Sequence, residues 1–193
     1  FCDPVVAEKT NLDLHTFYKS IGEACQEAIS AGFDVYAEPG RCLANPAGAV
    51  VTSVIGTNIR NDQRWTYLDD GIYGCYSIKS YENHEFQFYP INSIRQAKNL
   101  HTSNSKKTWT VAGPTCDSLD VIAEDVELPE SLNCGDLILT PNLGAYSVST
   151  SCAFNGFSLP ECYVVRTVMK NNKMSTIILN SDTHSQDKIA ANS

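Results

Sequence analysis

From Gly48 onward the sequence is divided into short runs rich in β-branched residues, and this pattern limits the possible fold more than any other feature. The clearest runs are 49–55, 135–140 and 162–168. Valine, isoleucine and threonine favour extended backbone, so each run is typical of a strand. Turn sequences separate the runs, at 69–71, 92–93, 113–114 and 155–156. The pattern predicts a mainly β fold: an antiparallel β-domain of sandwich or barrel type with Greek-key connections.

The first 46 residues have a different pattern. Apolar residues recur at helical spacing over 12–30, which predicts a helix capped by Thr10 or Asn11 and ended by Gly32. Residues 33–37 then predict a short buried strand that leads into the loop 38–41. A helix, a strand and a loop in this order are typical of the edge of a TIM-type α/β barrel. We therefore predict a residual barrel end over 1–46, a β-domain over 47–170 and a polar tail over 171–193, in which a short strand or irregular chain is expected.

Composition excludes several classes of function. With 193 residues, 42% of them hydrophobic, the chain can bury a core. A net charge of −8 argues against nucleic acid, since binding phosphates requires clustered basic residues. The eight cysteines contain no C-x-x-C pair and the four histidines are scattered, so no metal site is expected. A signal-peptide core and long apolar runs are absent, which predicts a soluble cytoplasmic protein without membrane partners.

Two loops carry residues suited to chemistry. In 38–41, Gly40 allows close approach of a ligand and Arg41 offers a planar fork suited to phosphate. Taken alone, however, the loop is better explained as an ordinary Pro-Gly turn with a solvated arginine. In 113–120, Cys116 and Asp117 could supply an acid and a cation-binding group. A turn with a buried cysteine and a helix-capping aspartate is about as good an explanation of that loop.

Three further sites are weaker. The segments 142–146 and 154–157 each place an aromatic residue beside a glycine-bearing turn, a combination that usually packs a core and less often lines a cleft. Glu82 lies near His84, and the simplest interpretation of this segment is the solvated end of a strand.

Together and in order, five segments resemble recurrent motifs of the ornithine decarboxylase group of fold III pyridoxal enzymes. The segments read EPGR at 38–41, DGIYG at 70–74, GPTCDSLD at 113–120, GAY at 144–146 and FNGF at 154–157. Each motif alone is weak, but five in register are highly specific. The resemblance runs from about residue 32 to residue 166 and implies pyridoxal 5′-phosphate as the cofactor.

The resemblance assigns roles around that cofactor. Glu38 would pair with the pyridine nitrogen and keep it protonated, so that the ring accepts the electrons left when carbon dioxide departs. The Gly40 backbone N–H, Arg41 and the Tyr146 hydroxyl would hold the phosphate. Cys116 would protonate Cα after decarboxylation, which decides between the amine and a wrongly protonated product.

The resemblance also implies a substrate pocket. Asp117 and Glu82 would bind the distal cation of the substrate, with Tyr73 and Phe154 as pocket walls and Asn155 as a polar support. In this family the cysteine loop enters the pocket of the neighbouring subunit, so a homodimer with shared sites is implied. The implied reaction is decarboxylation of L-ornithine to putrescine, in polyamine biosynthesis.

Two departures from the family pattern bear on these roles. Ornithine decarboxylases usually carry aspartate at the position of Glu82, and glutamate also suits some arginine-type relatives, so arginine and lysine decarboxylases are alternatives. Diaminopimelate is disfavoured because Asp117 would repel its second carboxylate. The lysine that holds the cofactor as a Schiff base lies earlier in the family's enzymes, and none of the nine lysines here has its context. The chain thus looks like a C-terminal portion, predicted to be inactive alone.

A non-catalytic regulatory homologue is a further alternative. Such relatives need not keep the cofactor-binding and acid residues. The presence of these residues in this chain counts against a non-catalytic homologue.

Overall fold

The computed structural model describes residues 7–8, 10–82, 84–91, 105–170 and 173–180. The chain divides into two compact units, Phe1–Leu159 and Pro160–Ser193. Among the helices of these described ranges, none combines the length and apolar character that a membrane crossing requires.

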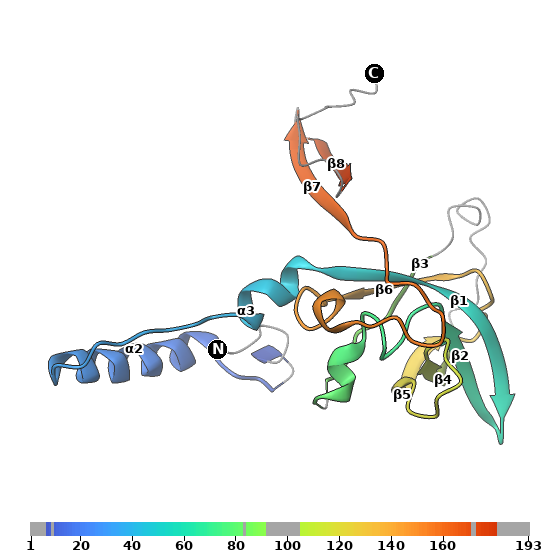
Figure 1. Ribbon diagram of the computed structural model, residues 1–193, viewed down its shortest axis with the longest axis horizontal. Helices are drawn as coiled ribbons and strands as arrows, with labels where there is room; N and C mark the ends of the chain where they lie inside the picture. The colour runs from blue at the N-terminus through green and yellow to red at the C-terminus, as the bar shows by residue number, and fades with distance from the viewer. Residues whose placement is uncertain (1–6, 9, 83, 92–104, 171–172, 181–193) are drawn as a thin grey trace. The chain divides into compact units, whose positions relative to one another are not determined.

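The first unit contains a six-stranded sheet (Figure 1). Its strands follow the order β3-β6-β1-β2-β4-β5. Neighbouring strands are antiparallel except for the pair β2 and β4, which is parallel. The predicted mainly β fold is confirmed, and the runs 49–55 and 135–140 fall on β1 and β6. The bounds are β1 Ala49–Arg60, β2 Gln63–Leu68, β3 Tyr89–Ile91, β4 Lys106–Ala112, β5 Val121–Pro129 and β6 Leu137–Pro141.

Strand β1 joins the two halves of the sheet. Its first residues, 49–53, pair with β6, and its residues from Val54 onward pair with β2. A register shift between Val54 and Gly56 marks the change of partner, and the long strand bends along its length (Figure 1). Asn61 and Asp62, both with positive φ, close the tight turn from β1 to β2, as expected for a hairpin whose turn matches the strand twist.

Apolar side chains from five strands form one core. Val54, Leu68, Val111, Ile122 and Ile138 are fully buried, and each contributes about 1.5–3 kcal/mol of transfer free energy. This rigid core supports the loops at the strand ends, where the candidate site lies.

Tyr76 is the largest fully buried side chain. Its hydroxyl is 2.9 Å from Thr140 Oγ1, so the polar end of the ring is hydrogen-bonded. Burial raises the pKa of Tyr76. The ring thus anchors the segment 70–80, which follows β2, against the sheet.

The N-terminal helix α2 (Leu14–Ser30) forms where helical spacing predicted it. The predicted caps Thr10 and Asn11 are wrong, because Asp13 caps the helix and accepts the His15 N–H at 3.0 Å. Gly32 follows the helix with a φ of +90°, a conformation that glycine adopts without steric cost.

The buried strand predicted over 33–37 is wrong. These residues form no regular element, and Phe33 and Tyr36 are 68% and 88% exposed. A parallel barrel strand needs neighbouring strands to satisfy its backbone groups and cover its side chains, and the described part of the chain provides none at this place. Local propensity for extended backbone therefore does not produce a buried strand without neighbouring strands.

The second unit contains the hairpin of β7 (Tyr163–Lys170) and β8 (Lys173–Asn180), paired antiparallel from Tyr163 with Asn180 to Lys170 with Lys173. β7 includes most of the predicted run 162–168, and β8 supplies the strand expected beyond residue 170. Residues 181–193 of the predicted tail and the predicted turn at 92–93 lie outside the described residues. The domain boundaries at 46 and 170 stay predictions.

Candidate functional site: two groups of loop residues

The first group surrounds the guanidinium of Arg41, which opens the short helix α3 (Arg41–Ala44). Arg41 Nη1 donates to Glu82 Oε1 at 2.6 Å, and the guanidinium carbon lies 4.9 Å from the centroid of the Tyr146 ring. Both charged side chains are about one-third exposed, at 34% and 38%. The guanidinium therefore contacts both a carboxylate and an aromatic face and remains accessible to solvent.

Two glycines bring Tyr146 to Arg41. The Gly144 N–H donates to Asn45 O at 3.0 Å and the Leu143 N–H to Gly48 O at 3.0 Å, so the loop before Tyr146 lies directly on the chain that follows α3. A Cβ at Gly144 would lie 1.9 Å from Ala44 O. Only glycine permits this approach of two backbones.

Tyr146 has a strained backbone. Its φ of +52° is uncommon for a bulky residue, and such strain occurs at ligand sites where the surrounding structure holds it. Its carbonyl accepts the Ser77 hydroxyl at 3.2 Å. Ser77 begins the 3-10 helix η2 (Ser77–Ser80), which leads to Glu82. One short helix thus helps to position two members of the first group, and sequence reasoning missed Ser77 because serine in this context carries no signal.

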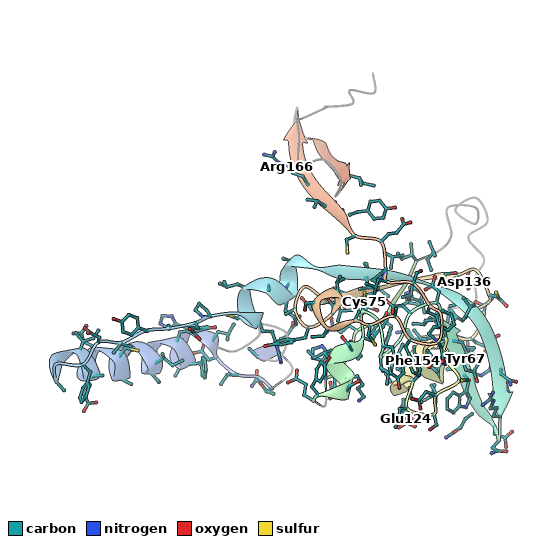
Figure 2. The ribbon with its side chains drawn as sticks, viewed as in Figure 1. Tyr67, Cys75, Glu124, Asp136, Phe154 and Arg166 are labelled. Atoms are coloured by element: carbon teal, nitrogen blue, oxygen red, sulfur yellow. The ribbon has the colours of Figure 1, made fainter. Side chains whose placement is uncertain are left out.

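The second group surrounds Tyr73 and Cys116. The Tyr73 ring stacks on Phe154, with centroids 4.0 Å apart, and the Tyr73 hydroxyl donates to the Asp117 carboxylate. The Asn155 side-chain amide donates to Cys116 Sγ at 3.3 Å. Phe154, labelled in Figure 2, comes from the segment after the 3-10 helix η3 (Val148–Thr150). Three loops distant in sequence therefore meet around one exposed thiol and one carboxylate.

Hydrogen bonds fix the protonation of the second group. The Leu119 backbone N–H and the Tyr73 hydroxyl lower the pKa of Asp117. The same bond to Asp117 raises the pKa of Tyr73 to about 12. At neutral pH the group thus presents an ionised carboxylate and a neutral phenol. A partly exposed carboxylate held ionised in this way is suited to a cationic ligand.

The sequence-predicted residues are divided by this arrangement. Arg41, Tyr146 and Glu82 form the first group, and Tyr73, Cys116, Asp117 and Phe154 form the second with Asn155. Glu82 and Asp117, to which the resemblance gives one shared role, therefore lie in different groups. Glu38 and Gly40 lie in the exposed segment 33–40.

Comparison with known proteins identifies the family. Residues 6–144 match the family model described as pyridoxal-dependent decarboxylase, C-terminal sheet domain. The chain belongs to this family. The pyridoxal-dependent decarboxylases include a lysine/ornithine decarboxylase of Selenomonas ruminantium that is 36% identical over 153 residues, which are 79% of this chain and 36% of the relative.

Solved structures of pyridoxal-dependent decarboxylases have the same fold. SrLDC in complex with PLP and cadaverine has a TM-score of 0.64 at 35% identity, with 77% of this chain and 36% of that chain covered. The arginine decarboxylase of Paramecium bursaria Chlorella virus bound to agmatine has a TM-score of 0.56 at 30% identity, with 64% and 32% covered. This chain spans about a third of the length of these relatives.

The first group fits the phosphate of pyridoxal phosphate, the cofactor of this family. Arg41 already donates to an anionic oxygen at 2.6 Å, and its exposed guanidinium has further N–H donors for phosphate oxygens. Tyr146, which is 46% exposed, offers its hydroxyl as another donor. Glu38, an exposed carboxylate three residues before Arg41, is suited to a protonated pyridine nitrogen.

Proposed function

We propose that this chain is the C-terminal part of a pyridoxal phosphate-dependent enzyme that decarboxylates L-ornithine to putrescine. The single observation that carries the proposal is the second group: an exposed thiol, Cys116, next to a carboxylate, Asp117, that the Tyr73 hydroxyl and a backbone N–H keep ionised. A proton donor beside a cation-binding carboxylate is what decarboxylation of a basic amino acid requires.

The first group would hold the cofactor. Arg41, Tyr146 and the Gly40 N–H would bind the phosphate, and Glu38 would pair with the pyridine nitrogen. When bound, the cofactor accepts the electron pair left as carbon dioxide departs. Glu82 would orient Arg41 through their 2.6 Å ion pair while its free oxygen attracts the substrate's distal cation.

The second group would bind and protonate the substrate. Asp117 attracts the distal ammonium, while the stacked rings of Tyr73 and Phe154 form an apolar wall along the substrate's carbon chain. After carbon dioxide has departed, the Cys116 thiol would give its proton to Cα and then regain one from water. The Asn155 amide, which donates to Cys116 Sγ, holds the sulfur in one position.

We propose further that the two groups complete one site across a homodimer interface. The contacts described above lie within the Arg41 group or within the Cys116 group, as expected if one subunit provides the cofactor side and its partner the acid side. Such an isologous dimer has two equivalent sites.

Lysine and arginine decarboxylases remain the alternatives within the family. The relatives described above include a lysine/ornithine enzyme and an arginine enzyme. A non-catalytic regulatory homologue is opposed by the retained thiol, carboxylate and arginine.

We expect the full-length protein that carries this chain to release carbon dioxide from ornithine with a higher kcat/KM than from lysine or arginine. Glu82→Asp withdraws the carboxylate by roughly 1 Å from Arg41 and from the substrate end, so the ornithine-to-lysine ratio of kcat/KM should change by roughly 10-fold or more. Glu124→Asp, on the exposed part of β5, is the matched control and should leave the ratio unchanged. Carbon dioxide release is measured for the three amino acids.

Two results would count against this account. Absence of carbon dioxide release from every basic amino acid would reject the proposed function. An unchanged ratio in Glu82→Asp would leave the decarboxylase assignment intact but would clear Glu82 of any selective role.

A further inference from the structure

Asp120 is a buried carboxylate at the end of an otherwise accessible loop. It is 2% exposed, and each of its carboxylate oxygens accepts hydrogen bonds. Oδ1 accepts the Ile72 N–H at 2.9 Å. Oδ2 accepts the Thr115 N–H at 3.0 Å and the Thr115 hydroxyl at 2.7 Å. Three donors compensate the loss of water around this charged group, which would otherwise be costly to bury.

The donors come from two loops distant in sequence. Ile72 belongs to the loop 70–74 and directly precedes Tyr73. Thr115 belongs to the loop 113–120 and directly precedes Cys116. Asp120 therefore holds the backbone immediately before a ring of the candidate site and immediately before its thiol.

Two glycines make room for this carboxylate. A Cβ at Gly71 would lie 2.3 Å from Asp120 Oδ1, and a Cβ at Gly113 would lie 2.2 Å from the same atom. Neither glycine has a positive φ, so space around the carboxylate, and not backbone conformation, explains the requirement for glycine. The two loops therefore share one buried centre.

The geometry points to Asp120 as a positioning residue that locks the Cys116–Asp117 loop to the Tyr73 loop. By holding the two loops together, Asp120 places the Tyr73 hydroxyl within hydrogen-bond distance of the Asp117 carboxylate. Its effect on catalysis rests on the function proposed above, whereas its effect on the two loops does not.

The test follows the Tyr73 phenol by NMR in the full-length protein labelled with ¹³Cζ-tyrosine, with Tyr73→Phe to assign the signal. The pKa of Tyr73 is about 12 because its hydroxyl donates to Asp117. In Asp120→Asn the side-chain amide faces N–H donors where a carboxylate accepted them, so the loops separate. The pKa of Tyr73 should then fall toward its ordinary value of 10.

Two further variants keep the charge of Asp120, which itself contributes a little to the pKa of Tyr73. Gly113→Ala forces the carboxylate aside and should also lower the pKa of Tyr73. Thr115→Val keeps the side-chain volume and removes the hydroxyl that donates to Asp120 at 2.7 Å and accepts the Asp117 N–H at 3.4 Å, so it should give an intermediate pKa of Tyr73. Gly56→Ala is the control, since its Cβ would be at an ordinary 3.8 Å from Tyr67.

The proposal would be overturned if the pKa of Tyr73 stayed at about 12 in folded Thr115→Val. The pKa would also have to stay there in Asp120→Asn or Gly113→Ala, if either of these variants folds. The decarboxylation assay tests the effect of Asp120 on catalysis separately from its effect on the two loops. We expect kcat/KM to fall by roughly 10- to 100-fold in Asp120→Asn, with unchanged KM for the cofactor. If the pKa of Tyr73 falls in the variants but even the unaltered protein decarboxylates no basic amino acid, the positioning role of Asp120 is supported and the proposed function is rejected.

Discussion

Replacing Cys116 with alanine is expected to lower the decarboxylation rate of the full-length protein by roughly 100- to 10,000-fold, the contribution typical of a general acid. Alanine leaves Cα without a positioned proton donor, so water must supply the proton from a less defined direction. A larger share of wrongly protonated product should therefore accompany the slower rate. Carbon dioxide release and product analysis measure both effects.

Cys134→Ala is the matched control. Cys134 is also an exposed thiol, and its Sγ lies 3.4 Å from Ile55 O in a turn outside both groups of the candidate site. We expect its rate to stay within about twofold of the unaltered protein, since surface substitutions remote from a site have small effects. If Cys116→Ala also kept its rate and its product, the acid would have to be sought elsewhere.

Replacing Arg41 with alanine is expected to weaken binding of pyridoxal phosphate by roughly 100-fold, because hydrogen bonds to a charged group contribute about 1.5–3 kcal/mol and a further penalty arises from Glu82. Without its partner at 2.6 Å, the Glu82 carboxylate is a negative charge beside the phosphate position, with His84 Nδ1 4.0 Å from its Oε1. Titration of the apoenzyme with the cofactor, followed by absorbance, gives the affinity.

Two variants separate these contributions. Arg64→Ala removes an ion pair of the same kind, 3.1 Å from Glu130, away from the candidate site, and should leave cofactor affinity unchanged. Adding Glu82→Gln to Arg41→Ala removes this negative charge and should recover part of the lost affinity. An Arg41→Ala protein that binds the cofactor as tightly as the unaltered one would show that the phosphate lies elsewhere.

Much of the β fold could be predicted from local sequence. The β-branched run at 49–55 and the turn residues between runs report backbone preference directly, and the structure has strands there. The exposed state of 33–37 could not be predicted, because its apolar residues favour a strand while the described residues provide no strand beside it. The parallel pairing of β2 with β4 was also out of reach, since pairing between distant strands leaves no mark on either strand alone.

The candidate site shows the same division. The motif resemblance indicated Arg41, Cys116 and Asp117, but no motif says which residues contact one another. That Glu82 pairs with Arg41, and that Tyr73 pairs with Asp117, are facts of three-dimensional packing. Asp120 ends the GPTCDSLD segment, but its burial between two glycines is visible only in the fold.

The most direct test of the central claim is complementation between two impaired variants of the full-length protein, Arg41→Ala and Cys116→Ala, mixed under conditions that allow subunits to exchange. The cofactor is kept at a concentration that saturates the unaltered protein but leaves Arg41→Ala largely empty. If one site combines the Arg41 group of one subunit with the Cys116 group of its partner, half of the random dimers are mixed and each has one intact site. Activity should then return to about a quarter of that of the unaltered protein. No recovery, in a mixture shown to contain mixed dimers, would contradict a site shared between subunits.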